Sequence, residues 1–394
     1  MAKASLLKVA GAILSAPKVV FARPSINGFL CGYLRKFTPV EVGGRIFVHS
    51  HLPPLNSLAY KRFVEEHLLS ASAGPSHAQI GVTNACPQNC AYCYNKGRAG
   101  VPLDTHAILD TVSQLQEMGV FWIGLTGGEP LLNIDLPCVI RAIGERSSSK
   151  LFTTGTSLTP KRVRELGDAG LVSVSVSLDH WEEGEHDRAR NTPGAYIAAL
   201  RAIDLFKADG RIHIGVSAVL SQAMLTPESV TQYLEFVSCL GVHEAWLSET
   251  KPTPEARSDE VISASDREML IRLQDSWNAK GGMTVNYLGH FEDARHFGCS
   301  AGNKMVYIDA FGDVSPCVFI PMSFGNVRER PLREIYADMK RRFPTEERCF
   351  INRNAGTLAA HVRGKGPIPR DVSELILDSL AFDPKPRFFK LLYR

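Results

Sequence analysis

From about residue 76 onward, short apolar runs alternate with longer amphipathic segments along the chain. The apolar runs are rich in β-branched residues, which is typical of strands buried on both faces of a parallel sheet. The amphipathic segments repeat apolar residues at helical spacing, and glycines end several of them. The pattern predicts six strand–helix units. Their strands are expected within 77–86, 120–130, 150–156, 171–179, 212–220 and 242–249.

Repeated strand–helix units build either an open parallel sheet or a barrel. Six units are fewer than the eight of a closed barrel, so we predict an α/β protein with a partial (β/α)6 barrel. In such folds the chemistry lies at the carboxyl ends of the strands. A cysteine-rich loop at 86–93 and the sequence TGGEP at 126–130 both occupy this position.

The segments outside these units divide the chain further. Residues 1–75 hold an apolar and basic segment followed by a strand and a helix, and residues 76–251 hold the barrel core. Residues 252–290 form a connector with one helix that completes the barrel. We predict a small auxiliary, twitch-like domain at 291–355 and a tail at 356–394.

Composition narrows the class of protein. Of 394 residues, 44% are hydrophobic and 22% charged, and the formal net charge of +3 is too small to indicate nucleic acid as a partner. Nine cysteines, an odd number in a long chain, do not fit a disulfide framework, so we expect reduced thiols in the cytoplasm. Cys138 and Cys239 lie on predicted helices and are expected in the core. The first apolar stretch is interrupted by Lys8 and stops at Pro17, far short of the roughly 20 residues that span a bilayer.

The loop after the first strand contains Cys86, Cys90 and Cys93 in the spacing C-x3-C-x2-C. Thiolates bind soft metals, and three on one loop can hold three corners of an iron–sulfur cubane. A structural zinc site closes with four ligands, often as two C-x2-C pairs, and no second pair follows here. Three protein ligands leave one iron open to another group.

These residues resemble the signature of the radical S-adenosylmethionine (SAM) superfamily. The resemblance rests on the three cysteines with Tyr92 before the last, on GGEP at 127–130, and on SLDHWEEGEHDRAR at 177–190. Alone, GGEP would indicate only a turn. The resemblance covers about residues 76–350. It implies an enzyme in which a reduced [4Fe-4S] cluster cleaves SAM to a 5′-deoxyadenosyl radical, which abstracts hydrogen from an unactivated carbon of the substrate.

Site residues follow from this resemblance position by position. The three cysteines would ligate the cluster whose open iron binds SAM. Backbone, hydroxyl and guanidinium groups would hold the rest of SAM, with Arg190 preferred to Arg188 because the family's spacing counts to it. The implied cofactor-binding residues are Tyr92, Gly127, Gly128, Glu129, Pro130, Thr153, Thr154, Ser177, Arg190 and Ser217.

A second cysteine group, formed by Cys299, Cys317 and Cys349, follows the barrel. The pattern Cys-x12-Gly-x4-Cys resembles the start of a SPASM or twitch extension, in which relatives bind auxiliary iron–sulfur clusters. A full SPASM domain has seven cysteines, so the three present imply one auxiliary [4Fe-4S] cluster. Its fourth position would be open to substrate or filled by a group such as His296. A degenerate domain with buried thiols is the alternative, and a hairpin at 307–317 is expected to bring Cys299 near Cys317.

The substrate is less constrained by the sequence. WLSETKP at 246–252 ends the sixth strand at the mouth of the predicted barrel, so we predict that Glu249 and Lys251 face the substrate as catalytic residues, with ordinary surface charge as the alternative. Peptide maturation or cofactor and natural-product biosynthesis is the first hypothesis, although no peptide-binding domain is recognised within 1–75. A purely binding role does not fit the intact motifs. The resemblance implies a flavodoxin or ferredoxin as electron donor.

Radical modification of a membrane lipid or another hydrophobic substrate is the alternative function. Both chain ends mix basic with apolar residues, which suits peripheral contact with an anionic bilayer. Packing of both ends on the barrel would explain the same composition. The N-terminal set is Lys3, Leu6, Leu7, Lys8, Val9, Ile13, Leu14, Lys18, Val19, Val20, Phe21 and Arg23. The C-terminal set is Lys385, Arg387, Phe388, Phe389, Lys390, Leu391, Leu392, Tyr393 and Arg394.

Overall fold

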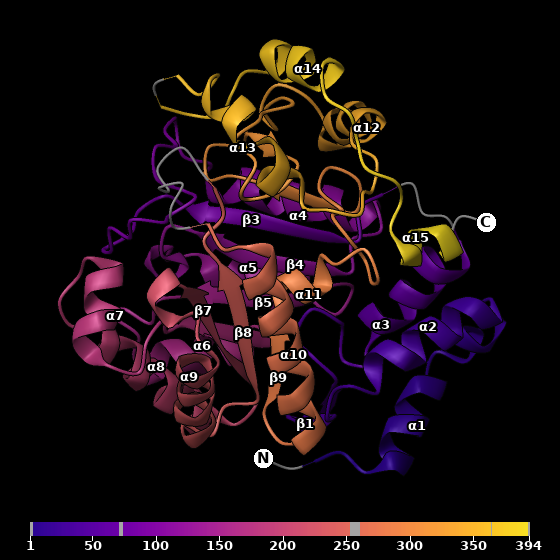
Figure 1. Cartoon of the computed structure of the whole chain (residues 1–394), viewed down its shortest axis with the longest axis vertical. Coiled ribbons are helices and arrows are strands. Elements are labelled where there is room, and N and C mark those ends of the chain that lie inside the picture. The colour runs from indigo at the N-terminus through magenta and orange to yellow at the C-terminus, as the bar shows by residue number, and fades with distance from the viewer. Residues whose placement is uncertain (1–2, 71–73, 253–260, 364, 393–394) are drawn as a thin grey trace.

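A nine-stranded sheet forms the centre of the computed structural model, which describes residues 3–70, 74–252, 261–363 and 365–392 (Figure 1). Tyr393 and Arg394 therefore lie outside the described residues. Six strands of the sheet are the predicted ones, and they run parallel: β3 (His77–Thr83), β4 (Trp122–Gly127), β5 (Ser148–Thr153), β6 (Ser173–Ser177), β7 (His213–Leu220) and β8 (Glu244–Glu249). The predicted α/β fold is confirmed.

Three further strands extend the sheet beyond the six expected ones. β9 (Thr284–Tyr287) pairs in parallel with β8, and β10 (Met305–Ile308) pairs in parallel with β3 at the opposite edge. β11 (Val314–Ser315) continues that edge as the antiparallel partner of β10. Within the described parts of the chain no pairing joins β11 to β9, so the sheet stays open, as a partial barrel requires.

Helices between the strands surround this sheet (Figure 1). Asp104, Thr159 and Thr226 each accept a hydrogen bond from a backbone N–H in the first turn of a helix, which satisfies a donor that the helix leaves free. The helices are α4 (Thr105–Glu117), α5 (Leu136–Ile143), α6 (Pro160–Asp168), α7 (Glu183–Arg190), α8 (Ala195–Asp209), α9 (Pro227–Cys239) and α10 (Ala264–Lys280), with 3-10 turns at Pro130–Leu132 and Gln222–Met224.

The main core lies between the sheet and these helices. Every residue of β4 is buried, as expected for a strand covered on both faces. Cys138 and Cys239, which we expected in the core, are exposed, so that prediction is wrong. Their helices bury Val139 and Val237 instead, because each helical position turns by about 100° and neighbouring residues face different directions.

The N-terminal region forms a helical layer beside the barrel (Figure 1). Its elements are α1 (Leu6–Leu14), a 3-10 turn (Pro17–Phe21), α2 (Pro24–Leu34), the hairpin of β1 (Val40–Val42) and β2 (Arg45–Phe47), α3 (Leu58–Arg62) and a π-helix (Phe63–Leu69). The C-terminal helix α15 (Arg387–Leu392) packs on α2, where Phe388 contacts Phe29 and Phe297. Phe388 and Phe389 of the C-terminal set are thus buried.

A segment at 47–52, which begins at the last residue of β2, crosses the amino-terminal end of the barrel. The carbonyl of Ser50 accepts a hydrogen bond from the Trp122 indole at 2.8 Å, and its hydroxyl accepts one from Lys150 Nζ at 2.6 Å. The backbone N–H of Ser50 donates to a carboxylate oxygen of Glu244 at 3.0 Å. These contacts with β4, β5 and β8 close that end of the barrel with a segment from outside the repeats.

The C-terminal region follows β9 along the chain. Its strands β10 and β11 extend the sheet beyond β3. The expected hairpin at 307–317 is confirmed by the pairing of β10 with β11. A buried ion pair between Arg98 and Asp309, 2.9 Å long, ties this hairpin to the segment after the first cysteine group. The remaining helices are α11 (Leu288–Phe291), α12 (Leu332–Arg342), α13 (Phe350–Ala359) and α14 (Arg370–Asp378).

Candidate active site

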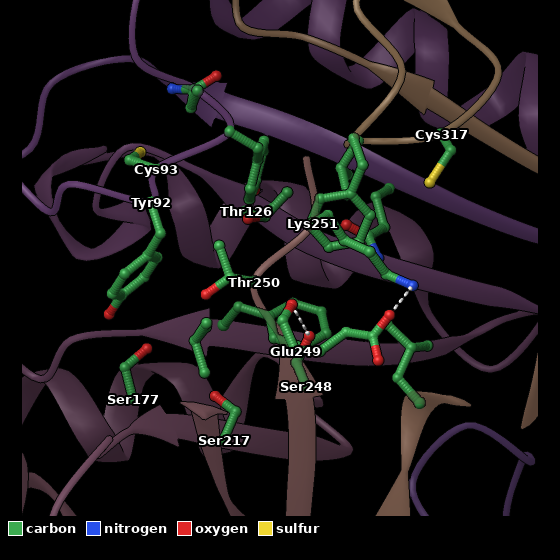
Figure 2. A pocket seen from close by; sticks show the side chains of 18 of the residues that line it. Tyr92, Cys93, Thr126, Ser177, Ser217, Ser248, Glu249, Thr250, Lys251 and Cys317 are labelled. Atoms are coloured by element: carbon green, nitrogen blue, oxygen red, sulfur yellow. Dashed lines mark hydrogen bonds and ion pairs between the residues drawn. The ribbon is translucent and has the colours of Figure 1, made fainter. Parts of the chain in front are cut away.

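A cavity of about 560 Å³ lies at the carboxyl ends of the parallel strands. The first cysteine group lines one side and the second cysteine group lines another, as Cys93 and Cys317 show in Figure 2. Glu129 and Pro130 of the predicted site residues lie behind the wall. The predicted residues that line the cavity are Cys86, Cys90, Tyr92, Cys93, Gly127, Gly128, Thr153, Thr154, Ser177, Arg190, Ser217, Glu249, Lys251, Cys299, Cys317 and Cys349.

The first cysteine loop is braced by the turn that follows β4. The backbone N–H of Gly128 donates to the carbonyl of Thr83, and that of Glu129 donates to the carbonyl of Ala85, each at 2.7 Å. A Cβ on Gly128 would lie 2.1 Å from the Ala85 oxygen, so only glycine fits there. The position of the cysteines therefore depends on a turn from the neighbouring strand.

The donor set of this loop fits an iron–sulfur cluster. The three thiols form no disulfide, and desolvation raises the pKa of Cys86 to about 11, so its proton stays until a metal replaces it. Among the described residues, no three His, Cys, Asp or Glu side chains converge as ligands of a single metal ion do. A cubane has no such requirement, because each thiolate binds a different iron.

Glu129 links the GGEP turn to the end of β5. Its carboxylate accepts hydrogen bonds from the Thr153 hydroxyl at 2.7 Å and from the backbone and hydroxyl of Thr154 at 2.6 Å each. Burial raises the pKa of Glu129, whereas these hydrogen bonds favour its charged form. The carboxylate thus holds two strand ends together while the two threonines reach the cavity wall.

Arg190, the last residue of α7, lies in the cavity wall. Its Nε and Nη2 donate to the two carboxylate oxygens of Asp179 at 2.7 and 2.9 Å, and the hydroxyl of Tyr92 donates to the same carboxylate. Burial would raise the pKa of Asp179, but the charge of Arg190 outweighs it and lowers that pKa. Arg188, the alternative, forms an exposed ion pair instead.

Hydroxyl groups follow the strand ends around the cavity. Ser177 on β6 and Ser217 on β7 are register partners, and Figure 2 shows both beside the cavity. Thr126 and Ser248 line the same cavity from β4 and β8, although the sequence motifs do not include them. Each is the next-to-last residue of its observed strand, at the carboxyl end where this fold places its chemistry.

The second cysteine group forms another wall of the cavity. Backbone hydrogen bonds between Cys299 and Glu346, 2.8 and 3.0 Å long, bring the segment before Cys349 alongside Cys299. A hydrogen bond between these two thiols lowers the pKa of Cys349 and, with burial, raises that of Cys299. Burial raises the pKa of Cys317 to about 12. The structure thus gathers the three thiols on one wall.

A buried charge network lies beside this second group. Lys251 Nζ is 3.0 Å from Glu249 Oε1, 2.6 Å from Glu292 Oε2 and 3.5 Å from Cys349 Sγ. Burial would lower the pKa of Lys251, but these three neighbours outweigh it and raise that pKa. Burial would raise the pKa of Glu249, yet Lys251 and Arg267 bring it to about 2. Both predicted catalytic residues therefore line the cavity as charged groups with protein partners (Figure 2).

His296, considered as a fourth ligand of the auxiliary cluster, is absent from the cavity lining. Its ring packs 4.1 Å from that of His290 and 5.6 Å from that of Tyr33, within an aromatic cluster. The carboxylate of Glu292 lies in the wall instead. No sequence motif marks Glu292, because its position follows from the short helix α11 after a strand that the pattern did not predict.

Two family models match the chain at these two cysteine groups. Residues 80–237 match the Radical SAM superfamily, and residues 299–354 match SPASM, an iron-sulfur cluster-binding domain. An AdoMet-dependent heme synthase of Methanosarcina barkeri is 28% identical over 284 residues, which span 65% of this chain and 80% of that protein. The mycofactocin maturase MftC of Mycobacterium tuberculosis is 28% identical over 252 residues, spanning 60% of this chain and 63% of that one.

Solved structures show the same fold. Streptococcus suis SuiB bound to its precursor peptide SuiA superposes with a TM-score of 0.60 at 14% identity, over 74% of this chain and 77% of that one. Motif, fold and family matches agree on the identity of both cysteine-bearing regions. Residues 80–237 thus form a radical SAM domain and residues 299–354 a SPASM-type region, the two parts of a radical SAM enzyme whose cofactors are SAM and iron–sulfur clusters.

Proposed function

We propose that this enzyme removes a hydrogen atom from an unactivated carbon of a peptide, or of a small precursor of a cofactor or natural product. The observation that carries the proposal is one cavity lined by both cysteine groups. When bound to a reduced [4Fe-4S] cluster, SAM supplies a 5′-deoxyadenosyl radical as the hydrogen-abstracting group. The chain's own residues hold the reactants, orient them and exclude water.

The SAM side of the cavity is proposed to be the first cysteine loop and the strand ends beside it. Cys86, Cys90 and Cys93 would ligate the cluster. Arg190, which keeps N–H donors beyond the two that Asp179 accepts, would bind a carboxylate. The remaining groups would be the glycine backbone after β4, Tyr92, and the hydroxyls of Thr153, Thr154, Ser177 and Ser217, with Glu129 and Pro130 shaping the turn.

The substrate side is proposed to be the second cysteine group and the charges beside it. Cys299, Cys317 and Cys349 would ligate an auxiliary [4Fe-4S] cluster, with its fourth position toward the substrate. Glu249 and Lys251 would face the substrate between the two groups, held in position by their 3.0 Å ion pair.

Similarity to proteins that act on or bind peptides supports a peptide substrate. MftC is a maturase, another relative is the PqqA peptide cyclase of Granulibacter bethesdensis, and SuiB was solved with a precursor peptide. A flavodoxin or ferredoxin is proposed as the electron donor. A lipid or other hydrophobic substrate is the second candidate, favoured by apolar residues exposed on α1.

Iron and sulfide content after anaerobic reconstitution tests the proposal. Each [4Fe-4S] cluster contributes about four irons, so we expect about eight in the wild type. Cys86→Ala/Cys90→Ala/Cys93→Ala should keep about four and lose 5′-deoxyadenosine release from SAM. Cys299→Ala/Cys317→Ala/Cys349→Ala should also keep about four.

The matched control replaces the three cysteines outside both groups. Cys31→Ala/Cys138→Ala/Cys239→Ala should keep about eight irons, because these thiols are exposed and are not among the residues that line the cavity. Full iron content in the second-group variant would remove the auxiliary cluster from the proposal. Continued 5′-deoxyadenosine release in the first-loop variant would overturn the proposal as a whole.

A further inference from the structure

The solvent side of the N-terminal helix is apolar. α1 packs Ala12 into the protein and partly buries Val9 and Ile13. In its first turn, Leu6 is 88% and Leu7 87% exposed. A helix on the surface of a globular protein normally presents polar residues to water and apolar ones to the core. α1 presents apolar residues in both directions.

The exposed apolar surface continues into the next turn of the chain. Phe21 is 78% exposed, and Leu14 and Val20 are also exposed. We call Leu6, Leu7, Leu14, Val20 and Phe21 the N-terminal apolar patch. Of the twelve large apolar side chains exposed in the described residues, these five lie within sixteen consecutive positions. Single exposed apolar residues need no explanation, whereas such a cluster marks a surface that binds something.

The charged residues that surround this patch in the sequence are all basic. Residues 1–40 contain six basic residues and no acidic one. Lys8 pairs with Glu41 and Lys18 pairs with Glu65, but all four side chains are solvent-accessible. Exposed ion pairs of this kind contribute little to stability, so they can exchange partners at a negatively charged surface.

The dimensions of α1 favour a position along a surface. Its nine residues span about 14 Å, about half of the hydrocarbon thickness of a bilayer. No helix in the described residues is long and apolar enough to cross a membrane. We propose that the N-terminal apolar patch inserts into the interface of an anionic lipid bilayer, with its lysines and arginine at the headgroups.

This proposal does not depend on the substrate or on the radical chemistry. Exposed apolar side chains can insert into a bilayer. The basic residues of 1–40, a stretch without Asp or Glu, fit the negative charge of an anionic bilayer. A second copy of this chain would bring the same basic residues against one another, which is unfavourable. The C-terminal apolar residues do not contribute, because Phe388 and Phe389 are buried against α2.

Vesicle flotation with the full-length protein tests the proposal. The probes are vesicles of phosphatidylcholine alone and of phosphatidylcholine with phosphatidylglycerol, at low and high salt. We expect the wild type to float with the anionic vesicles and to bind less at high salt. Leu7→Glu/Phe21→Glu should weaken this binding about tenfold or more, because two apolar contacts are lost and two negative charges are added.

Ile197→Glu/Leu375→Glu is the matched control, since it makes the same chemical change at two exposed apolar residues elsewhere. It should float like the wild type. Equal flotation of both double variants, or no flotation of the wild type, would overturn the proposal. Light scattering measures the oligomeric state. If the wild type is a dimer and Leu7→Glu/Phe21→Glu is a monomer, the patch binds a second copy of this chain and the bilayer proposal is overturned. Release of 5′-deoxyadenosine is measured separately, in solution without vesicles. The membrane proposal and the proposed function can therefore be refuted independently of each other.

Discussion

Two histidines outside the cavity lining, His49 and His67, are buried and neutral. Burial lowers the pKa of His49 to about 4 and that of His67 to about 3, from an ordinary value of about 6.5. His67 donates through Nε2 to the carbonyl of Gly119 at 2.8 Å. The unfolded chain binds protons at these rings already near pH 6.5. The two lowered pKa values therefore leave the free energy of unfolding undiminished above pH 6.5, and they reduce it as the pH falls toward 4.

His67→Gln removes this titration while an amide N–H can still reach Gly119. We expect its free energy of unfolding to fall less steeply between pH 6.5 and 4 than that of the wild type, by up to about 1.4 kcal/mol per pH unit. Urea unfolding followed by circular dichroism across this range measures the difference. His106→Gln, at an exposed position, should match the wild-type slope. An unchanged slope in His67→Gln would contradict the prediction.

At the scale of elements, the cysteine loop and the turn after β4 form one unit. Gly128 lies against the backbone of Asn84 and Ala85 where the loop begins, and Gly127, with a φ of +120°, lies against the end of β3. A side chain added at either glycine would collide with backbone atoms, which cannot move aside as a flexible side chain can. The sequence motif thus has a mechanical reason beside its proposed role toward SAM: it allows two loops from neighbouring strands to touch.

Gly128→Ala should therefore displace the first cysteine loop. We expect the reconstituted variant to lose about half of its iron, because only the cluster proposed at Cys86, Cys90 and Cys93 is affected. Gly184→Ala is the control, since a Cβ there meets open space. Retention of full iron content by Gly128→Ala would show that the loop tolerates the displacement.

The hydrophobic pattern was enough to predict the six central strands, because a strand buried on both faces leaves a continuous apolar run. It did not predict β9 as a seventh parallel strand, and the edge strands β10 and β11 are too short to stand out. The motifs marked residues that touch SAM in the family. They could not mark Thr126, Ser248 or Glu292, whose places depend on which chain segments meet at the cavity.

At the scale of the molecule, the two family regions share one sheet. β10 from the SPASM-type region pairs with β3 of the radical SAM region along four residues, and the buried Arg98–Asp309 ion pair joins them again. We expect one cooperative unfolding transition in scanning calorimetry, because neither region keeps a complete sheet without the other. Two separate transitions would show that the regions are independent.

The chain ends contribute to the same unit through α15. Phe388→Ala should lower the free energy of unfolding by about 3–5 kcal/mol, since it empties a buried aromatic contact with Phe29 and Phe297. Lys390→Ala, on the same helix, should cost less than about 1 kcal/mol, because it removes only an exposed ion pair. Denaturant unfolding of both variants measures the difference, and equal effects would contradict the packing role of α15.

The segment at 47–52 has a consequence for the order of events during synthesis. Its residues leave the ribosome before β4, β5 and β8, yet Ser50 bonds to side chains of all three strands. The last of these hydrogen bonds, to Glu244 on β8, can form only after more than half of the chain has emerged. A segment that is synthesised before every strand of the barrel is therefore among the last to complete its contacts.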